Sequence, residues 1–340
     1  MRPTFIPRLV NGPFEDPGLF VPLAFRKRAI LFDLGDLSAL SAGDILKTTH
    51  VFITHTHMDH FSGFDQMLRL LLGRQKSLHM FGPRGLLNNI AGKLQGYTWN
   101  LVRHYDEGLN ITVTEIDAQT RTTRTFKCLE RFAPSPATMG PSRLPLAYEE
   151  PGFNVQTAIL DHEIPSLAFA VQERFHINIL KPRLQELGLE AGPWVSRFKK
   201  LLYEGVNPDS KIEVQRANRA GTTTTLPIGE LAENITRITA GQKIAYIADV
   251  VYSTENERKI IKLAHKADHL FIEAAFLEKD HSIAKKKYHL TAHQAGMLAH
   301  KSQVREMTIF HHSPRYMDQA HLFQKEARRS FKGPQSLQTG

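Results

Sequence analysis

The sequence Thr54-His55-Thr56-His57-Met58-Asp59-His60 directly follows the apolar run Val51-Phe52-Ile53. The apolar run predicts a buried strand, and the polar residues then fall in the loop where this strand ends. Imidazoles and a carboxylate that converge from such a loop are suitable ligands for zinc or another first-row metal. We expect His55 and His57 to bind one ion, and Asp59 and His60 to turn toward a second.

Two such ions would define a specific chemistry. Placed roughly 3.5–4 Å apart, they would clamp an attacking hydroxide and a leaving oxygen during phosphoester hydrolysis. The competing interpretation is a polar loop that is rich in His by chance, since the chain contains 17 His. The interleaved order of His and Asp directly after a strand favours the metal site.

The hydrophobic pattern predicts alternating strands and helices, which indicates a layered α/β fold. Residues 133–152, rich in Pro and Gly, are expected to form a surface loop. Residues 176–230 differ from the rest of the chain in composition, and we expect them to form an excursion from the core. They include a basic amphipathic segment at 195–203. The strands are expected at residues 29–33, 50–54, 78–81, 111–116, 157–160, 167–171, 244–249, 269–273 and 307–311, and the helices at 41–47, 64–72, 86–94, 260–267 and 289–300.

Further polar residues follow the later predicted strands, at the edge where open α/β sheets place ligands. They are Asp161-His162, Asp249, Glu273 and His311-His312. Taken singly, a carboxylate at a strand end usually caps the next turn, and a lone His usually has a structural role. The series, together with the His/Asp loop, predicts one shared site.

Composition limits the class of protein. The 340 residues are 41% hydrophobic and 23% charged, as in a globular protein with a large core, and the formal net charge of +9 favours a polyanionic partner. The single cysteine, Cys128, excludes an intramolecular disulfide framework and fits a reducing compartment. No apolar run is long enough to span a membrane, and the N-terminal residues lack the apolar core of a secretory signal. We therefore expect a cytoplasmic protein with no membrane partner.

Together these residues resemble the metallo-β-lactamase superfamily and, within it, the ribonuclease Z family of tRNA 3′-end endonucleases. The resemblance runs from about Ile30 to about Tyr316 and includes a Gly-Pro element at residues 187–193. Its markers are Phe32-Asp33-Leu34-Gly35, the loop at 55–60, Leu160-Asp161-His162, Ala245-Tyr246-Ile247-Ala248-Asp249, Glu273-Ala274-Ala275-Phe276, His289-Leu290-Thr291 and His311-His312-Ser313-Pro314-Arg315-Tyr316. The chain departs from the family pattern in its Pro-rich segment 5–25, in Ala248-Asp249-Val250 and in Glu273-Ala274-Ala275.

The resemblance implies a four-layer αββα sandwich with an inserted arm. Residues 1–330 would form a single metallo-β-lactamase domain, with the arm at 176–230 and a C-terminal tail at 331–340. It also implies a homodimer in which the arm of one subunit holds RNA for the site of the other.

The resemblance further assigns roles within a centre of two zinc ions, with Mn²⁺ as an alternative metal. His55, His57 and His162 would bind one ion, Asp59, His60 and His311 the other, and Asp249 would bridge them. His312 is the weaker ligand candidate. His289 would donate a proton to the leaving 3′-oxygen, Glu273 would orient it and raise its pKa, and Asp59 would steer the hydroxide.

The expected substrate is the 3′ end of a tRNA precursor, cut when a hydroxide held by the metals attacks the phosphodiester. The candidate substrate contacts are Lys199 and Lys200 in the arm, Arg315 and Tyr316 in the motif that ends the resemblance, and the run Lys285-Lys286-Lys287. One alternative is a small-molecule hydrolase of the same fold, such as a cyclic-nucleotide phosphodiesterase, an arylsulfatase or a lactonase. Another is a non-catalytic RNA-binding relative, which would require a broken ligand set.

Overall fold

The computed structural model describes residues 4–24, 27–217 and 222–333. By internal contacts the chain divides into two compact units. The larger comprises Phe5–Ala147, Val155–Val171 and Lys243–Gly340, and the smaller comprises Met1–Thr4, Tyr148–Asn154 and Gln172–Gln242. Residues 334–340 of the predicted tail and residues 218–221 of the predicted arm lie outside the described residues. No helix in the described ranges combines the length and the apolar character needed to cross a bilayer.

The larger unit is built on two sheets. In the first, strands β1 to β8 lie in chain order, with parallel pairing from β3 to β6 and antiparallel pairing on either side. In the second, the strand order is β18-β17-β16-β11-β10-β9, and β16, β17 and β18 are parallel. The strands of the first sheet are β1 (Arg8–Leu9), β2 (Leu19–Pro22), β3 (Ala29–Phe32), β4 (Thr48–Phe52), β5 (Lys76–Pro83), β6 (Leu109–Ile116), β7 (Thr120–Lys127) and β8 (Thr138–Pro141). Those of the second are β9 (Leu146–Glu150), β10 (Phe153–His162), β11 (Ile164–Glu173), β16 (Lys243–Ile247), β17 (His269–Glu273) and β18 (Glu306–Phe310).

The inner faces of the two sheets meet in a layer of aromatic rings. Phe32 and Phe52 of the first sheet stack at a centroid distance of 5.4 Å, and both contact Phe169 of the second. Tyr246 of β16 stacks on Phe32 at 5.7 Å. Each of these four rings is at most 1% exposed, so the sheets are joined by tightly packed apolar surface.

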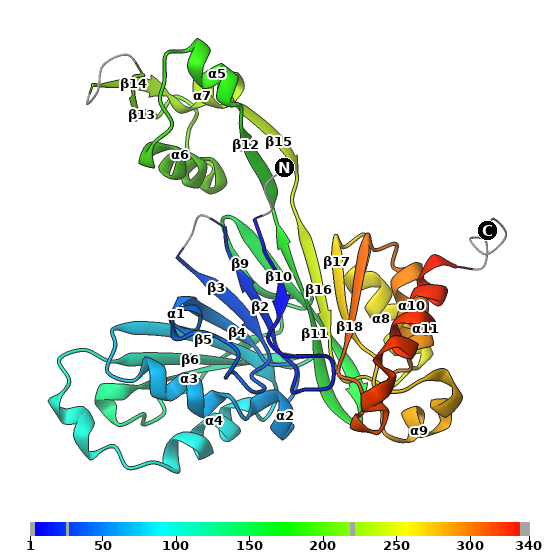
Figure 1. The fold of residues 1–340 in the computed structure, drawn as a ribbon. Helices are drawn as coiled ribbons and strands as arrows, with labels where there is room; N and C mark the ends of the chain where they lie inside the picture. The colour runs from blue at the N-terminus through cyan, green and yellow to red at the C-terminus, as the bar shows by residue number, and fades with distance from the viewer. Residues whose placement is uncertain (1–3, 25–26, 218–221, 334–340) are drawn as a thin grey trace. The chain divides into compact units, whose positions relative to one another are not determined.

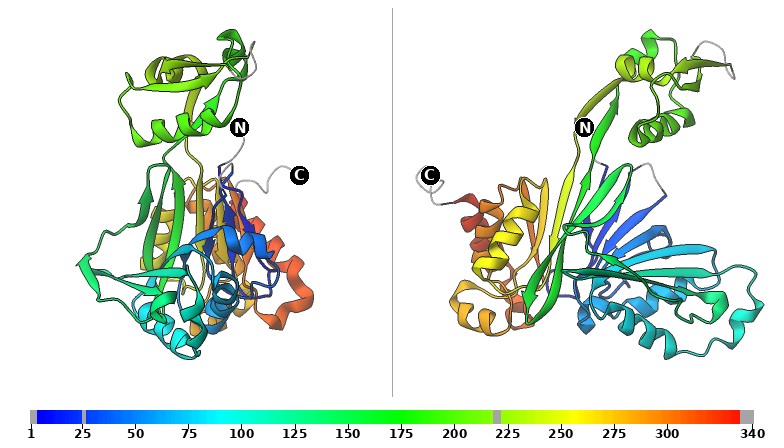
Figure 2. Two further views of the ribbon diagram at one scale, coloured as in Figure 1. Left: turned by 90° about the vertical axis from the view of Figure 1, so that its left-hand side faces the viewer. Right: turned by 180° about the vertical axis from the view of Figure 1, so that it is seen from behind.

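Helices cover the outer face of each sheet, which completes the predicted αββα order (Figure 1; Figure 2). Over the first sheet lie α1 (Ala42–Lys47), α2 (Met58–Phe61), α3 (Phe64–Leu71) and α4 (Leu86–Gln95). Over the second lie α8 (Thr254–Ala264), α9 (His281–Lys286), α10 (Ala292–Lys301) and α11 (Ala320–Lys332). The helical spacing of residues 64–72 buries Phe64, Met67, Leu68 and Leu71 on one side of α3, as the sequence predicts.

The smaller unit has a core of its own. Strand β12 (Phe175–Ile179) pairs with β15 (Thr236–Ala240), and β13 (Lys211–Gln215) pairs with β14 (Thr223–Pro227). Helices α5 (Lys181–Glu186), α6 (Pro193–Glu204) and α7 (Ile228–Ile235) pack around the fully buried Trp194 and Phe198. The predicted excursion at 176–230 falls inside this unit, and its Gly192-Pro193 pair begins α6, where Pro is tolerated because the first helical N–H has no intrahelical partner.

Some local predictions are wrong. Residues 133–152 were expected to be a surface loop but contain β8 and β9, because their Pro and Gly residues sit at strand ends and on a sheet edge. The helix expected from His289 begins only at Ala292, because Thr291 is its N-cap within a capping box.

Candidate metal centre

The predicted ligands come together at the carboxyl ends of several strands in the larger unit. His55 and His57 follow β4, and Asp59 and His60 lie on the short helix α2. The remaining groups are His162 at the end of β10, Asp249 after β16 and His311 after β18. Each comes from a different segment, so the tertiary structure alone brings them together.

The first group of ligands faces one oxygen of Asp249. The Asp249 Oδ2 atom lies 3.7 Å from His55 Nε2 and 3.5 Å from His162 Nε2. His57 Nδ1 is 3.0 Å from His55 Nε2. Ligand atoms of these four residues all lie within 4.8 Å of one another, close enough to bind one ion.

The second group faces the other oxygen of the same carboxylate. The Asp249 Oδ1 atom lies 2.8 Å from His311 Nδ1 and 3.5 Å from His60 Nε2. Asp59 Oδ2 is 3.2 Å from His311 Nε2 and 3.5 Å from His60 Nε2. Asp249 therefore stands between two sets of ligands, one oxygen toward each.

Unpaired buried atoms indicate that these groups fit a metal ion. His60 Nε2, Asp249 Oδ1 and His311 Nδ1 are buried and have no hydrogen-bond partner among the described residues. Leaving three buried polar atoms unpaired in one place is costly, and a cation among them would satisfy all three. His and Asp ligands in this arrangement fit zinc or a similar first-row metal.

Electrostatics in this cluster indicate where positive charge is favoured. Burial opposes protonation of His311, but the Asp249 carboxylate outweighs burial and raises the pKa of His311 to about 10. Burial likewise favours the neutral acid at Asp59, yet the hydrogen bond from His311 and the nearby imidazoles lower its pKa to about 2. By contrast, burial and the neighbouring His60 lower the pKa of His55 to about 2, so this imidazole is a neutral ligand.

Polar groups also contact the ring nitrogens of His60 and His162 that do not face Asp249. The Asp33 Oδ2 atom lies 2.9 Å from His60 Nδ1 and also accepts hydrogen bonds from the hydroxyls of Thr54 and Tyr246. His162 Nδ1 lies 2.7 Å from the carbonyl oxygen of Tyr288. Such partners set the tautomer and the orientation of a ligating imidazole. The sequence marks Asp33 only as part of the Phe32-Asp33-Leu34-Gly35 motif, and its contact with His60 emerges from the structure.

His289 and Glu273 form a pair beside the ligands. His289 Nδ1 lies 3.3 Å from both carboxylate oxygens of Glu273, which is itself fully buried and accepts the backbone N–H groups of Val250 and Leu290. Burial opposes protonation of His289, but Glu273 raises the pKa of this imidazole above its ordinary value. Asp249 Oδ2 is 3.9 Å from His289 Nδ1, so the pair adjoins the candidate metal centre.

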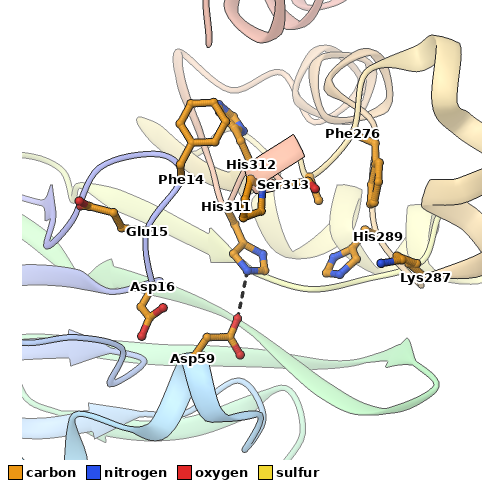
Figure 3. A pocket seen from close by; sticks show the side chains of 12 residues that line it. Phe14, Glu15, Asp16, Asp59, Phe276, Lys287, His289, His311, His312 and Ser313 are labelled. Carbon is orange, nitrogen blue, oxygen red and sulfur yellow. Dashed lines mark hydrogen bonds and ion pairs between the residues drawn. The ribbon is translucent and has the colours of Figure 1, made fainter. Parts of the chain in front are cut away.

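A pocket of about 240 Å³ opens on this centre (Figure 3). Asp59, His289 and His311 line it together with Lys287 and the N-terminal residues Phe14, Glu15 and Asp16. The sequence names the run Lys285-Lys286-Lys287 among the candidate substrate contacts, and Lys287 of this run lines the pocket. It does not predict the segment 14–16, because nothing in a Pro-rich stretch indicates which loop it will contact.

The candidate substrate contacts have different surroundings. Tyr316 is only 3% exposed and its hydroxyl donates to Asp280, so its ring packs in the core rather than presenting a surface to a substrate. Arg315 is exposed and lies 5.8 Å from the centroid of that ring. In the smaller unit, Lys199 donates to the carbonyl of Ile177, and Lys200 pairs with Glu204. His312, the weaker ligand candidate, is buried with Nδ1 2.8 Å from the carbonyl of Ala274, away from both ligand groups.

Curated proteins that are similar to this chain along most of its length are ribonucleases Z. The chain is 28% identical over 317 residues to ribonuclease Z of Deinococcus radiodurans, covering 91% of this chain and 90% of that protein. It is 25% identical over 299 residues to ribonuclease Z of Pyrococcus furiosus, covering 84% of this chain and 78% of that protein. No family model matches the chain.

Solved structures show the same fold. A metallo-β-lactamase fold protein of Bacillus subtilis, YhfI, superposes with a TM-score of 0.54 at 14% identity, covering 96% of this chain and 95% of that one. The short form of human tRNase Z superposes with a TM-score of 0.50 at 17% identity, covering 92% and 93%. The chain therefore has the metallo-β-lactamase fold. Along most of its length its sequence is similar to ribonucleases Z.

Proposed function

We propose that this protein is an endoribonuclease that uses two divalent metal ions to hydrolyse a phosphodiester at the 3′ end of tRNA precursors. The observation that carries the proposal is the position of Asp249, whose two carboxylate oxygens face separate groups of ligands. A carboxylate shared in this way supports two adjacent ions. Ions bound there would polarise the phosphodiester and supply an activated water.

The protein side chains have separate tasks in this proposal. His55, His57 and His162 would hold one ion, and Asp59, His60 and His311 would hold the other. Asp59, partly exposed at the pocket, also orients the attacking water. Glu273 lies against the Nδ1 atom of His289 and favours its protonated form, and the other nitrogen of His289 would donate a proton to the leaving 3′-oxygen.

Two findings support RNA as the substrate. Curated relatives along most of the chain are named ribonuclease Z, and the formal net charge of +9 suits a polyanion. Lys287, which lines the pocket beside His289, is suited to contact a phosphate next to the one that is cut. We also propose zinc as the metal, a cytoplasmic homodimer, and a tRNA-binding arm within the smaller unit.

Cleavage of an end-labelled tRNA precursor tests the proposal. The protein would be assayed with Zn²⁺ or Mn²⁺ beside bis-p-nitrophenyl phosphate, with Asp59→Ala as the control. We expect a cut on the 3′ side of the discriminator nucleotide that is lost in the variant. Hydrolysis of the small diester with the precursor left intact would keep the metal centre but reject tRNA, in favour of a small-molecule hydrolase of the same fold.

A further inference from the structure

The N-terminal loop 12–17 is held firmly against the candidate metal centre. The carbonyl of Pro13 accepts the backbone N–H of His312 at 2.6 Å, and the carbonyl of Pro17 accepts that of Gly35 at 3.1 Å. Between them, the Asn11 side-chain amide donates to the carbonyl of Asp16 at 2.8 Å. The loop is thus attached at one end to the segment that carries His311 and at the other to the turn that follows β3.

Close packing at Gly35 restricts the loop further. A Cβ atom added to Gly35 would lie 2.6 Å from Asp16 Cβ, 2.6 Å from the carbonyl oxygen of Pro17 and 2.8 Å from that of Asp59. No side chain fits there without moving one of these groups. The absence of a side chain at Gly35 therefore lets Asp16 approach the segment that carries Asp59.

The neighbouring carboxylates have hydrogen-bond donors within the protein, whereas Asp16 does not. Glu15 accepts the N–H of Gly12, Asp36 accepts the N–H and hydroxyl of Ser38, and Asp59 lies against His311. Within residues 4–24, 27–217 and 222–333, no group donates a hydrogen bond to the carboxylate of Asp16. Figure 3 shows this carboxylate in the pocket on the same side as Asp59.

A carboxylate in this position opposes binding of a phosphodiester unless the substrate supplies a donor. Burial and the charge of Asp59 both raise the pKa of Asp16, which means that the negatively charged form of this carboxylate is disfavoured in the free protein. Next to a scissile phosphate, the donors on a nucleic-acid backbone are the ribose 2′-hydroxyls, which RNA has and DNA lacks. Base amino groups lie farther from the backbone.

We infer that Asp16 is a specificity-determining residue that accepts a hydrogen bond from the 2′-hydroxyl of a ribose flanking the scissile phosphate. The inference rests on the proposed function, because it takes RNA as the substrate. A hydrogen bond to a charged acceptor corresponds to discrimination on the order of 10- to 100-fold. A deoxyribose at that position would leave Asp16 unpaired beside the phosphate.

The test compares kcat/KM for an all-ribose precursor with kcat/KM for precursors that carry one deoxyribose. A precursor is prepared with ribose throughout, and with a single 2′-deoxyribose on either side of the cut. For the wild-type protein we expect kcat/KM for the all-ribose precursor to exceed that for one of the deoxy precursors by about 10- to 100-fold. In Asp16→Ala this ratio should fall close to one, and bound metal is measured in parallel.

Asp36→Ala is the matched control, because it removes a nearby carboxylate that does not line the pocket. It should keep the wild-type ratio. An unchanged ratio in Asp16→Ala, or no discrimination by the wild-type protein, overturns the inference, and so does loss of bound metal in Asp16→Ala. If the precursor stays intact, the tRNA proposal fails separately, and the same ratio measured on a short single-stranded oligonucleotide decides the role of Asp16.

Discussion

Asp249 Oδ1 lies 2.8 Å from His311 Nδ1, yet neither atom makes a hydrogen bond within the described part of the chain. Both atoms are buried, and His60 Nε2, a third unpaired atom, lies 3.5 Å from the same oxygen. The protein has brought acceptor atoms together where an ordinary core would pair each with a donor. A cation among the three atoms, either a proton or a metal ion, would satisfy them.

The polar partners behind this cluster should control metal affinity. Asp33→Asn removes the charge that orients His60, and Asn tolerates the left-handed backbone (φ 56°) at this position. We expect metal affinity to fall by about 10- to 100-fold, measured by competition with a chromophoric chelator. Tyr246→Phe is the control, because it removes one donor to Asp33 and leaves the contact with His60. Wild-type metal affinity in Asp33→Asn would contradict this role.

The proposed acid is tested by changing the leaving group. His289→Ala should slow cleavage of the RNA precursor by about 10²- to 10⁴-fold, because the 3′-oxygen of ribose is a poor leaving group without a proton. Hydrolysis of bis-p-nitrophenyl phosphate should fall far less, because nitrophenolate leaves without protonation. Both substrates are compared at equal metal content. An equal loss on both would mean that His289 acts through the metals or through binding, not as the acid.

A buried His outside the ligand groups should make the free energy of unfolding depend on pH. His50 is 4% exposed and stacks on His79, and burial together with the charges of His79 and Arg28 lowers the pKa of His50 to about 3. The unfolded chain takes up a proton near pH 6.5 and the folded chain only near pH 3. His50 therefore costs stability progressively as the pH falls through this window.

The measurement is urea unfolding of the metal-free protein at pH 7.5 and pH 5. His50→Phe should lose less stability than the wild type between these conditions, by about 1–2 kcal/mol. His281→Gln, which replaces an exposed imidazole, should behave as the wild type. Parallel losses in His50→Phe and the wild type would show that His50 is not the group responsible.

Substitution of Gly by Ala should lower the free energy of unfolding at position 63 and raise it at position 92. A Cβ at Gly63 would lie 2.1 Å from the carbonyl oxygen of Gly35, so Gly63→Ala should lower the free energy of unfolding by about 1–3 kcal/mol. Gly92 lies exposed within α4 with no heavy atom within 4 Å of an added Cβ. Gly92→Ala should raise the free energy of unfolding by about 0.5–1 kcal/mol, because Ala favours the helix. Denaturant titrations of the two variants check both predictions. A rise in the free energy of unfolding in Gly63→Ala as well as in Gly92→Ala would refute the packing argument at Gly63.

The sequence by itself determined the layered α/β fold and named the His and Asp residues that the structure groups as candidate metal ligands. Local patterns carry that information, because a buried strand such as Val51–Ile53 and the ligands that follow it are adjacent in the chain. Helix ends and the strands β8 and β9 were less predictable, since capping at Thr291 and pairing at a sheet edge depend on neighbours distant in sequence.

Only the tertiary structure decided how the candidate ligands divide into two groups around Asp249. The two oxygens of Asp249 face different imidazoles because β4, β10, β16 and β18 end at one place, a fact that no local pattern contains. The same holds for Asp33 behind His60 and for Asp16 beside Asp59. These relationships join residues distant in sequence, and the contacts of Asp249 with His55 and His60 form only once the two sheets have packed together.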